Sequence, residues 1–490
     1  MRKFLSYIVE AKLAGKLHLL TQSAIAVNAL GQSLDFADVD NPLVRVHAGR
    51  LRKQLEEYYA TEGYFNTLRI NLPIGSYQPI FIANGHNYPD LYKNHNSSLS
   101  LGPSLLCIPR NFTSDYNNWA FIACLVRDYV IALNRFSFSQ TLFIDEVSTQ
   151  QANWPDDLRA QHQADFGFFF DLYQNEQGFC LKVSLAHSVT TEIIWAYSVE
   201  LGHQYPNTLQ SQAIFKRIAN DTVSYERGLA NDYWARYLLS LGKPIPPQYQ
   251  LLITLRQFSW NICLESFKAY VAVCEERLNY FPHDITALIS YADCCRIEYL
   301  LKYEVISPLK ETLQHLVYRL QQLAPQNAYT QLYTAFSYLL NDEHNLALEA
   351  LKKSQDINPL DTHLNILTGL MYMGLDQWEL GANYIRDSIN ISPLYPDWYH
   401  LPLSVYEYRV GNYLEAIQQA KYVKFKHLWG PMLRSALYGC NNAAEKSSRE
   451  YQTLLNEHPD LSKQHNLLTL DFPRKSHALI SRLWAHLPKK

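Results

Sequence analysis

The sequence reads Asn41-Pro-Leu-Val-Arg-Val-His-Ala-Gly-Arg-Leu-Arg-Lys-Gln-Leu-Glu-Glu-Tyr-Tyr59 at the stretch that decides the fold of its N-terminal part. An α-helix turns by about 100° per residue, so the apolar side chains of this stretch share one face. They are Val44, Ala48, Leu51, Leu55 and Tyr58. The remaining surface carries four cations: Arg45, Arg50, Arg52 and Lys53. The stretch therefore predicts a helix that packs by one face and presents positive charge, suited to a phosphate backbone, on the other.

The neighbouring segments complete a small domain. Two helices are expected upstream, each ended by a glycine, Gly15 and Gly31, and two strands downstream are joined by a turn over Pro73–Ser76. The expected helices and strands cover residues 4–14, 21–30, 68–72 and 77–81. Three helices followed by a hairpin predict a winged helix-turn-helix domain over residues 1–83.

This part of the sequence resembles a known bacterial domain. Residues 4–15, 44–59 and 69–77 look like the winged helix found ahead of tetratricopeptide arrays in adenylate-cyclase-like and TolB-like regulators. The resemblance implies a regulatory, DNA-binding module. The sequence departs from the family at Ile74, where members often have lysine, and it has no further segment before the first helix.

A second domain is expected after a polar linker over residues 84–102. Strands at 104–108 and 141–144, with a helix between them, precede a hairpin whose connection is Asn175–Gly178 and a last strand at 192–199. Pro109 is expected to end the first strand. These elements predict a small α/β sheet domain over 103–205 that resembles the TolB-like domain of the same regulators, followed by connecting helices over 206–249.

The C-terminal half is periodic. Pro325, Pro359 and Pro393 are 34 residues apart, the period of tetratricopeptide repeats, in which stacked helix pairs bury each other's apolar faces. Small or apolar residues keep the same spacing, for example Ala335 with Gly369 and Ala347 with Gly381. We expect four to five such repeats over 250–460, the first beginning near Glu265 and a later one closed by Pro431, with 461–490 as a cap or tail.

Composition narrows the function further. The chain has 490 residues, 48% of them hydrophobic, and this length and composition predict about three folded domains. Its net charge is only −3, so any contact with nucleic acid is expected to be confined to one domain. The sequence contains no long apolar run and no signal peptide, so a cytosolic protein is expected. Its eight cysteines are interpreted as reduced, mostly buried thiols. Phosphate-loop, zinc-protease and serine-hydrolase motifs are absent from the sequence, so we expect neither an enzyme nor a cofactor or metal site.

Two functional hypotheses remain. In the first, the protein is a one-component transcription regulator whose repeats bind a protein or peptide and whose winged helix binds double-stranded DNA. The DNA contacts would be made by Arg45, Arg50, Arg52, Lys53 and Arg69. A homodimer would suit a palindromic site. In the second, the winged helix no longer binds DNA and the chain is a protein-interaction scaffold. The second hypothesis is favoured by Ile74, by the missing upstream segment and by the net charge of only +2 over residues 1–83, from nine Lys or Arg against seven Asp or Glu.

Overall fold

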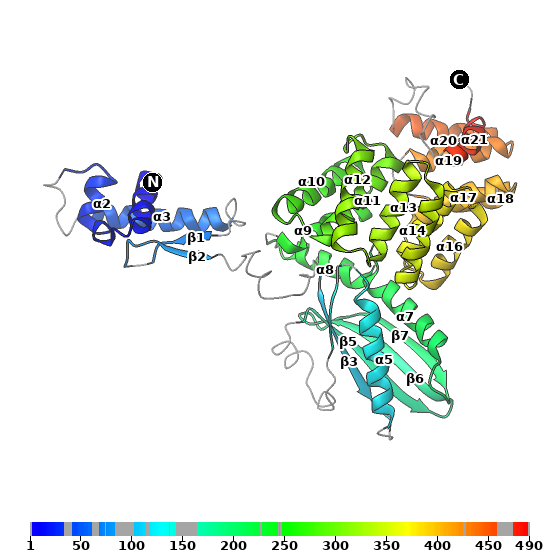
Figure 1. The fold of residues 1–490 in the computed structure, drawn as a ribbon, viewed down its shortest axis with the longest axis horizontal. Helices are drawn as coiled ribbons and strands as arrows, with labels where there is room; N and C mark the ends of the chain where they lie inside the picture. Colours follow the sequence, from blue (N-terminus) through cyan, green and yellow to red (C-terminus); the bar gives the residue numbers. More distant parts are fainter. Residues whose placement is uncertain are drawn as a thin grey trace. The chain divides into compact units, whose positions relative to one another are not determined.

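The computed structural model forms two units, residues 1–99 and 100–490 (Figure 1). Each unit is described by itself. The residues described are 2–33, 42–60, 68–73, 75–83, 102–113, 117–136, 138–143, 164–225, 228–243, 245, 247–424, 428–457 and 474–488.

The described residues of the first unit form three α-helices, a short 3-10 helix and a two-stranded antiparallel hairpin. Its elements are α1 Arg2–Leu13, η1 Leu17–Leu19, α2 Gln22–Asn28, α3 Pro42–Ala60, β1 Leu68–Asn71 and β2 Ile80–Ala83. Gly15 and Gly31 follow α1 and α2 with φ values of 70° and 68°, a conformation that suits a helix end because glycine has no Cβ. The apolar face of α3 is buried as expected, with Val44 at 1% exposure, against Phe4, Ile8 and Ile25.

The hairpin differs from the expected one in its second strand. Asn71 pairs with Ile80, so β2 begins three residues later than expected and the connection is longer than a tight turn. Leu72 is buried, and the carbonyl oxygens of Leu72, Pro73 and Ser76 accept hydrogen bonds from Arg52. These contacts replace strand pairing in the connection. Ile74 lies outside the described residues.

The second unit begins with a five-stranded mixed sheet of strand order β4-β3-β5-β6-β7. Its strands are β3 Ser104–Asn111, β4 Gln140–Phe143, β5 Phe166–Asn175, β6 Gly178–His187 and β7 Ile193–Gly202. β3 is parallel to β4 and β5, while β5, β6 and β7 are antiparallel neighbours. Helices α5 Asn117–Leu133 and α7 Thr208–Val223 share its apolar core, where the ring of Tyr129 contacts those of Phe168 and Phe215.

The expectation that Pro109 ends the first strand was wrong. Pro109 lies inside β3 and pairs with Phe170 of β5. The pairing of β3 with β4 covers only Ser104–Cys107, so at Pro109 the strand has one described neighbour. A proline is compatible with a strand where one side makes no ladder hydrogen bond, because its missing N–H is then not needed.

The rest of the unit is a helical array. Within 247–424 and 428–457, twelve helices form six successive pairs (green to orange in Figure 1). They are α9 Pro247–Trp260, α10 Leu264–Tyr280, α11 Ile285–Leu301, α12 Leu309–Leu323, α13 Ala328–Leu340, α14 His344–Ile357, α15 Thr362–Gly374, α16 Trp378–Ile391, α17 His400–Arg409, α18 Tyr413–Tyr422, α19 Trp429–Cys440 and α20 Ala444–Glu457. A final helix, α21 Arg474–Trp484, follows.

The 34-residue period is confirmed, with corrections at both ends. Pro325, Pro359 and Pro393 each follow the second helix of a pair. There are six pairs rather than four to five, because α9 pairs with α10 before the first expected repeat. Pro431 does not close a pair: it lies in the first turn of α19, a position where the missing N–H of proline costs no intrahelical hydrogen bond.

The irregular spacing before Pro325 comes from a longer loop and, as expected, a longer helix, because α11 has 17 residues where α13 and α15 have 13. The seven residues 302–308 join α11 to α12, where three residues join the helices of the next four pairs. The carboxylate of Glu298 accepts hydrogen bonds from the N–H groups of Glu304, Val305 and Ile306. The side chain of Glu298 therefore accepts hydrogen bonds from three backbone N–H groups of this longer loop.

The sheet and the helical array form one body. Residues 206–249, expected to be connecting helices, contain α7 and α8 Leu229–Ser240, and the C-terminal half of α7 is buried. Asn220 donates to the carbonyl oxygen of Leu360 at 2.7 Å and accepts from the N–H and hydroxyl of Thr362 at 2.9 and 2.6 Å. Arg217 donates to the carbonyl oxygen of Ile391 at 2.7 Å. Helix α7 therefore joins the sheet to the loops that follow α14 and α16.

Candidate functional site

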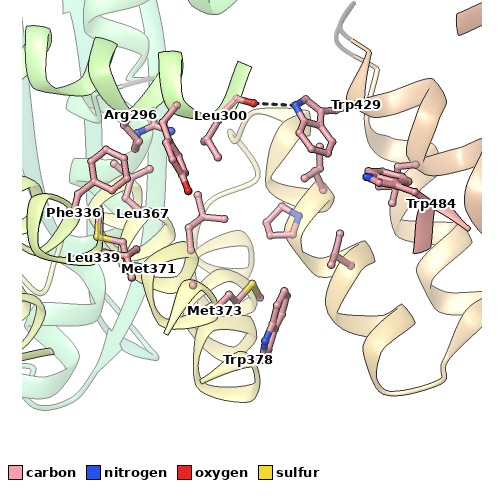
Figure 2. Close-up of a pocket in the computed structure, with 17 residues that line it drawn as sticks. Arg296, Leu300, Phe336, Leu339, Leu367, Met371, Met373, Trp378, Trp429 and Trp484 are labelled. Carbon is pink, nitrogen blue, oxygen red and sulfur yellow. Dashed lines mark hydrogen bonds between the residues drawn. The ribbon is translucent and has the colours of Figure 1, made fainter. Parts of the chain in front are cut away.

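An apolar pocket lies on the inner side of the helical array (Figure 2). We call it the inner pocket. It consists of two adjoining cavities of about 160 and 130 Å³ that share a wall formed by Arg296, Leu300, Leu370, Leu401, Pro402 and Trp429. Most of this wall comes from α11, α15, α17 and α19, the first helices of four pairs. Phe336, Met373 and Trp378 extend the lining of the larger cavity.

The apolar lining follows from where the first helices lie. In α15 twelve of the thirteen residues are buried, as expected for a helix that is covered on all sides. Leu300, Leu370 and Leu401 are half-buried at positions that line the pocket. These leucines leave apolar surface exposed inside the cavity, and burying such surface favours binding of an apolar group.

The array closes on itself at this pocket. The indole N–H of Trp429, at the start of α19, donates to the carbonyl oxygen of Leu300 in α11 at 3.0 Å (Figure 2). The two residues are 129 positions apart in the sequence. This contact joins the second pair to the sixth at the wall of the inner pocket.

The charge of the lining is neutralised. Among the described residues that line the larger cavity, Arg296 is charged, and its guanidinium lies 2.7 Å from the carboxylate of Asp293. Asp293 also accepts a hydrogen bond from the hydroxyl of Tyr333 at 3.0 Å. Burial, and then the charge of Asp293, raise the pKa of Tyr333 well above its ordinary value. The pocket therefore presents apolar surface and little free charge.

A larger polar chamber adjoins the pocket. It has a volume of about 620 Å³ and shares Phe258, Ile262 and Trp398 with the smaller apolar cavity. Its other walls bring together side chains from α8, α9 and the residues around α17, including Asp232, Asn261, Asp397 and Lys424. The apolar pocket and the polar chamber together resemble a binding cleft with an apolar end and a hydrogen-bonding end.

The adjacent thiols of Cys294 and Cys295 are poor nucleophiles. Cys274, Cys294 and Cys295 are fully buried in the array, and burial raises the pKa of the Cys294 and Cys295 thiols. The expectation of buried thiols was wrong for Cys124, which is exposed on α5. Among the described residues, no three His, Cys, Asp or Glu side chains gather as a metal site.

The cations expected to contact DNA separate into two groups. Arg45, Arg50 and Lys53 are exposed on α3. Arg52 instead donates to the carbonyl oxygens of Leu72 at 2.8 Å, Pro73 at 2.9 Å and Ser76 at 3.2 Å. Helical periodicity alone did not carry this difference, because at about 100° per residue Arg45 lies only about 20° from Arg52 around the helix and is nevertheless exposed. Arg69 is in β1 opposite Ile82, and its side chain lies outside the described part.

No family model matches the sequence, and no curated protein matches it either. Some solved structures are similar to part of the chain, among them the following three. YrrB, described as a TPR protein with an unusual peptide-binding site, is 14% identical, with a TM-score of 0.26 over 38% of this chain and 93% of that one. The Cut9–Hcn1 hetero-tetramer of APC/C is 13% identical, with a TM-score of 0.33 over 58% and 60%. The human IFIT1 dimer with PPP-AAAA is 16% identical, with a TM-score of 0.32 over 52% and 76%.

At these TM-scores the similarities support no further argument. The helix pairs and their 34-residue register are those of a tetratricopeptide-like array. The winged helix-turn-helix and TolB-like assignments stay predictions. None of the described helices is both long and apolar enough to cross a bilayer.

Proposed function

We propose that this protein is an interaction scaffold whose helical array binds a partner protein through an apolar peptide segment held in the inner pocket. The observation that carries the proposal is the apolar surface left open by Leu300, Leu370 and Leu401 inside an otherwise closed array. An apolar side chain of the partner would fill the pocket, and the polar chamber would accept the neighbouring backbone.

The test is a selection of displayed random-sequence peptides against the purified full-length chain, followed by affinity measurements. Leu401→Glu places a charge in the pocket and is expected to abolish binding, since an unpaired buried charge is unfavourable. Leu414→Glu is the matched control, because Leu414 is 75% exposed on α18. Circular dichroism verifies that both variants fold. If the two variants bind a selected peptide equally, or if no peptide is selected, the inner pocket is not the binding site.

A second candidate function is DNA binding by the first unit. It is supported by the exposure of Arg45, Arg50 and Lys53 on α3 and by the order of elements, three helices and then a hairpin. In a winged helix-turn-helix, α3 would enter the major groove and these cations would contact phosphates or base edges. Arg52 is left out of this set because it holds the hairpin connection.

Fluorescence anisotropy of a labelled random-sequence duplex, at low and near-physiological salt, tests this candidate. Replacing Arg45 and Arg50 by alanine is expected to weaken binding and to lower the slope against log salt by about two. The control replaces Lys352 and Lys353, both exposed on α14, which removes the same charge elsewhere. The DNA-binding candidate fails if the duplex is not bound at low salt, or if both double variants lose affinity equally.

A further inference from the structure

The C-terminal helix α21 does not continue the array. A further helix added to the last pair would contact α19 and α20. Helix α21 instead contacts both α19 and α15, and α15 belongs to a pair two steps earlier. It therefore lies across the inner side of the array.

Three contacts place the end of α21 against successive first helices. The rings of Trp484 and Trp429 of α19 have centroids 5.8 Å apart. His486 meets the ring of Tyr408 of α17 edge to face. Its carbonyl oxygen lies so near Gly439 that a Cβ there would approach it to 2.1 Å. The close fit at Gly439 indicates that the surface formed by Tyr408, Trp429 and Gly439 matches the shape of the end of α21. We call this surface the seat.

Helix α21 presents its apolar side chains to this seat. Leu479, Leu483 and Trp484 are 5%, 0% and 5% exposed, while Ala478 and Ala485 are exposed. Trp484 is itself part of the lining of the larger apolar cavity (Figure 2). The spacing of Leu479 and Leu483, with an adjacent tryptophan, is that of a helix bound in an apolar groove.

We propose that α21 is an internal ligand of this seat, which borders the inner pocket through Trp484, and that a partner presenting an amphipathic helix of the same Leu-x-x-x-Leu-Trp type competes with it for the seat. The occupant is inferred from the way α21 itself is seated. The proposal rests on the proposed function, because displacement matters only if the pocket binds a partner. The apparent affinity for the partner would then be proportional to the fraction of molecules in which α21 has left its seat.

The experiment uses the full-length chain with Leu479→Glu and Leu483→Glu, a variant whose α21 is expected to leave its seat. The control carries Ala478→Glu and Ala485→Glu, which add the same charge on the exposed side. The probe is a fluorescent synthetic peptide of residues 474–488. It should bind the release variant at least about tenfold more tightly than it binds the native chain or the control. A photoreactive group in place of Trp484 should cross-link the peptide to α15 or α19.

The outcomes separate the two proposals. Equal binding of the 474–488 peptide to all three proteins, or a cross-link outside the inner side, overturns the internal-ligand proposal. If that peptide binds the release variant but no displayed peptide is selected by any of the proteins, α21 is an internal ligand and the scaffold function fails. If displayed peptides bind the native chain and the release variant equally well, the scaffold function stands and α21 does not regulate it.

Discussion

Gly369 of α15 and Gly381 of α16 approach each other so closely that a Cβ on Gly381 would lie 2.4 Å from the carbonyl oxygen of Gly369. A Cβ on Gly369 would lie 2.7 Å from the carbonyl oxygen of Gly381. The positions 34 residues earlier, Ala335 and Ala347, hold the same place in the α13–α14 pair and are also buried. The repeat therefore requires small residues here, and α15–α16 is the pair that requires glycine.

Gly381→Ala is expected to destabilise the second unit by about 1–3 kcal/mol, because the new methyl group meets a backbone oxygen that cannot move without separating the helices. Guanidinium unfolding followed by circular dichroism measures the change. Ala347→Gly is the reference: it adds no atom, and its cost of about 1–2 kcal/mol should come from the lower helix propensity of glycine and the loss of one buried methyl group. A stabilised Gly381→Ala chain would contradict the close approach.

Arg52→Ala is expected to destabilise the first unit by about 1–2 kcal/mol, because three carbonyl oxygens of the hairpin connection lose a charged donor that is half-exposed to water. Amide hydrogen exchange over β1 and β2 should become faster. Arg45→Ala, at an exposed position of the same helix, is the control and should leave exchange unchanged. Equal protection in both variants would show that Arg52 does not hold the connection.

Asn220→Ala is expected to cost about 2–4 kcal/mol, because it leaves the buried carbonyl oxygen of Leu360 and the donors of Thr362 without their partner. Since these bonds join the sheet to the array, differential scanning calorimetry should show one transition for the second unit of the native chain and a broadened or divided one in the variant. Asn207→Ala, at the exposed N-cap of the same helix, should cost only about 1 kcal/mol and keep one transition.

Alkaline pH is expected to unfold the second unit. Burial raises the pKa of Tyr333 above the ordinary value of 10.0, and Asp293 adds to this shift. Stability is then fully present below pH 10 and is lost as pH rises above it, because the unfolded chain releases a proton that the folded chain keeps. Each such tyrosine contributes a slope of up to about 1.4 kcal/mol per pH unit. Tyr225, Tyr270 and Tyr329 are raised in the same direction.

Denaturant unfolding at a series of pH values above 10 measures this slope. Tyr333→Phe should reduce it by up to about 1.4 kcal/mol per pH unit. Tyr280→Phe is the control, since Tyr280 is 73% exposed on α10. If the slope is the same in the native chain and in Tyr333→Phe, Tyr333 does not keep its proton in the folded state.

Sequence patterns predicted the elements whose cause is local. The apolar stripe of α3 is buried, Gly15 and Gly31 end their helices, and the spacing of Pro325 and Pro359 marks helix pairs. The first two signals depend on residues within a few turns of one another, and the third on a period of 34 residues. Pro109 and Pro431 were misjudged for a related reason: a proline's effect depends on whether its missing N–H has a partner, and neighbours elsewhere in the chain decide that.

The sequence by itself determined that the chain contains a 34-residue helix-pair repeat, because prolines and small residues recur at that spacing along the chain. Only the tertiary structure decided that the array closes into a pocket, that α7 joins the sheet to it and that α21 lies across its inner side. Small rotations from one pair to the next add up until Trp429 reaches Leu300, 129 residues away. The contact of Arg217 in α7 with Ile391, 174 residues away, depends on how the sheet domain packs on the array. The accumulated rotation cannot be inferred from the sequence of any one repeat.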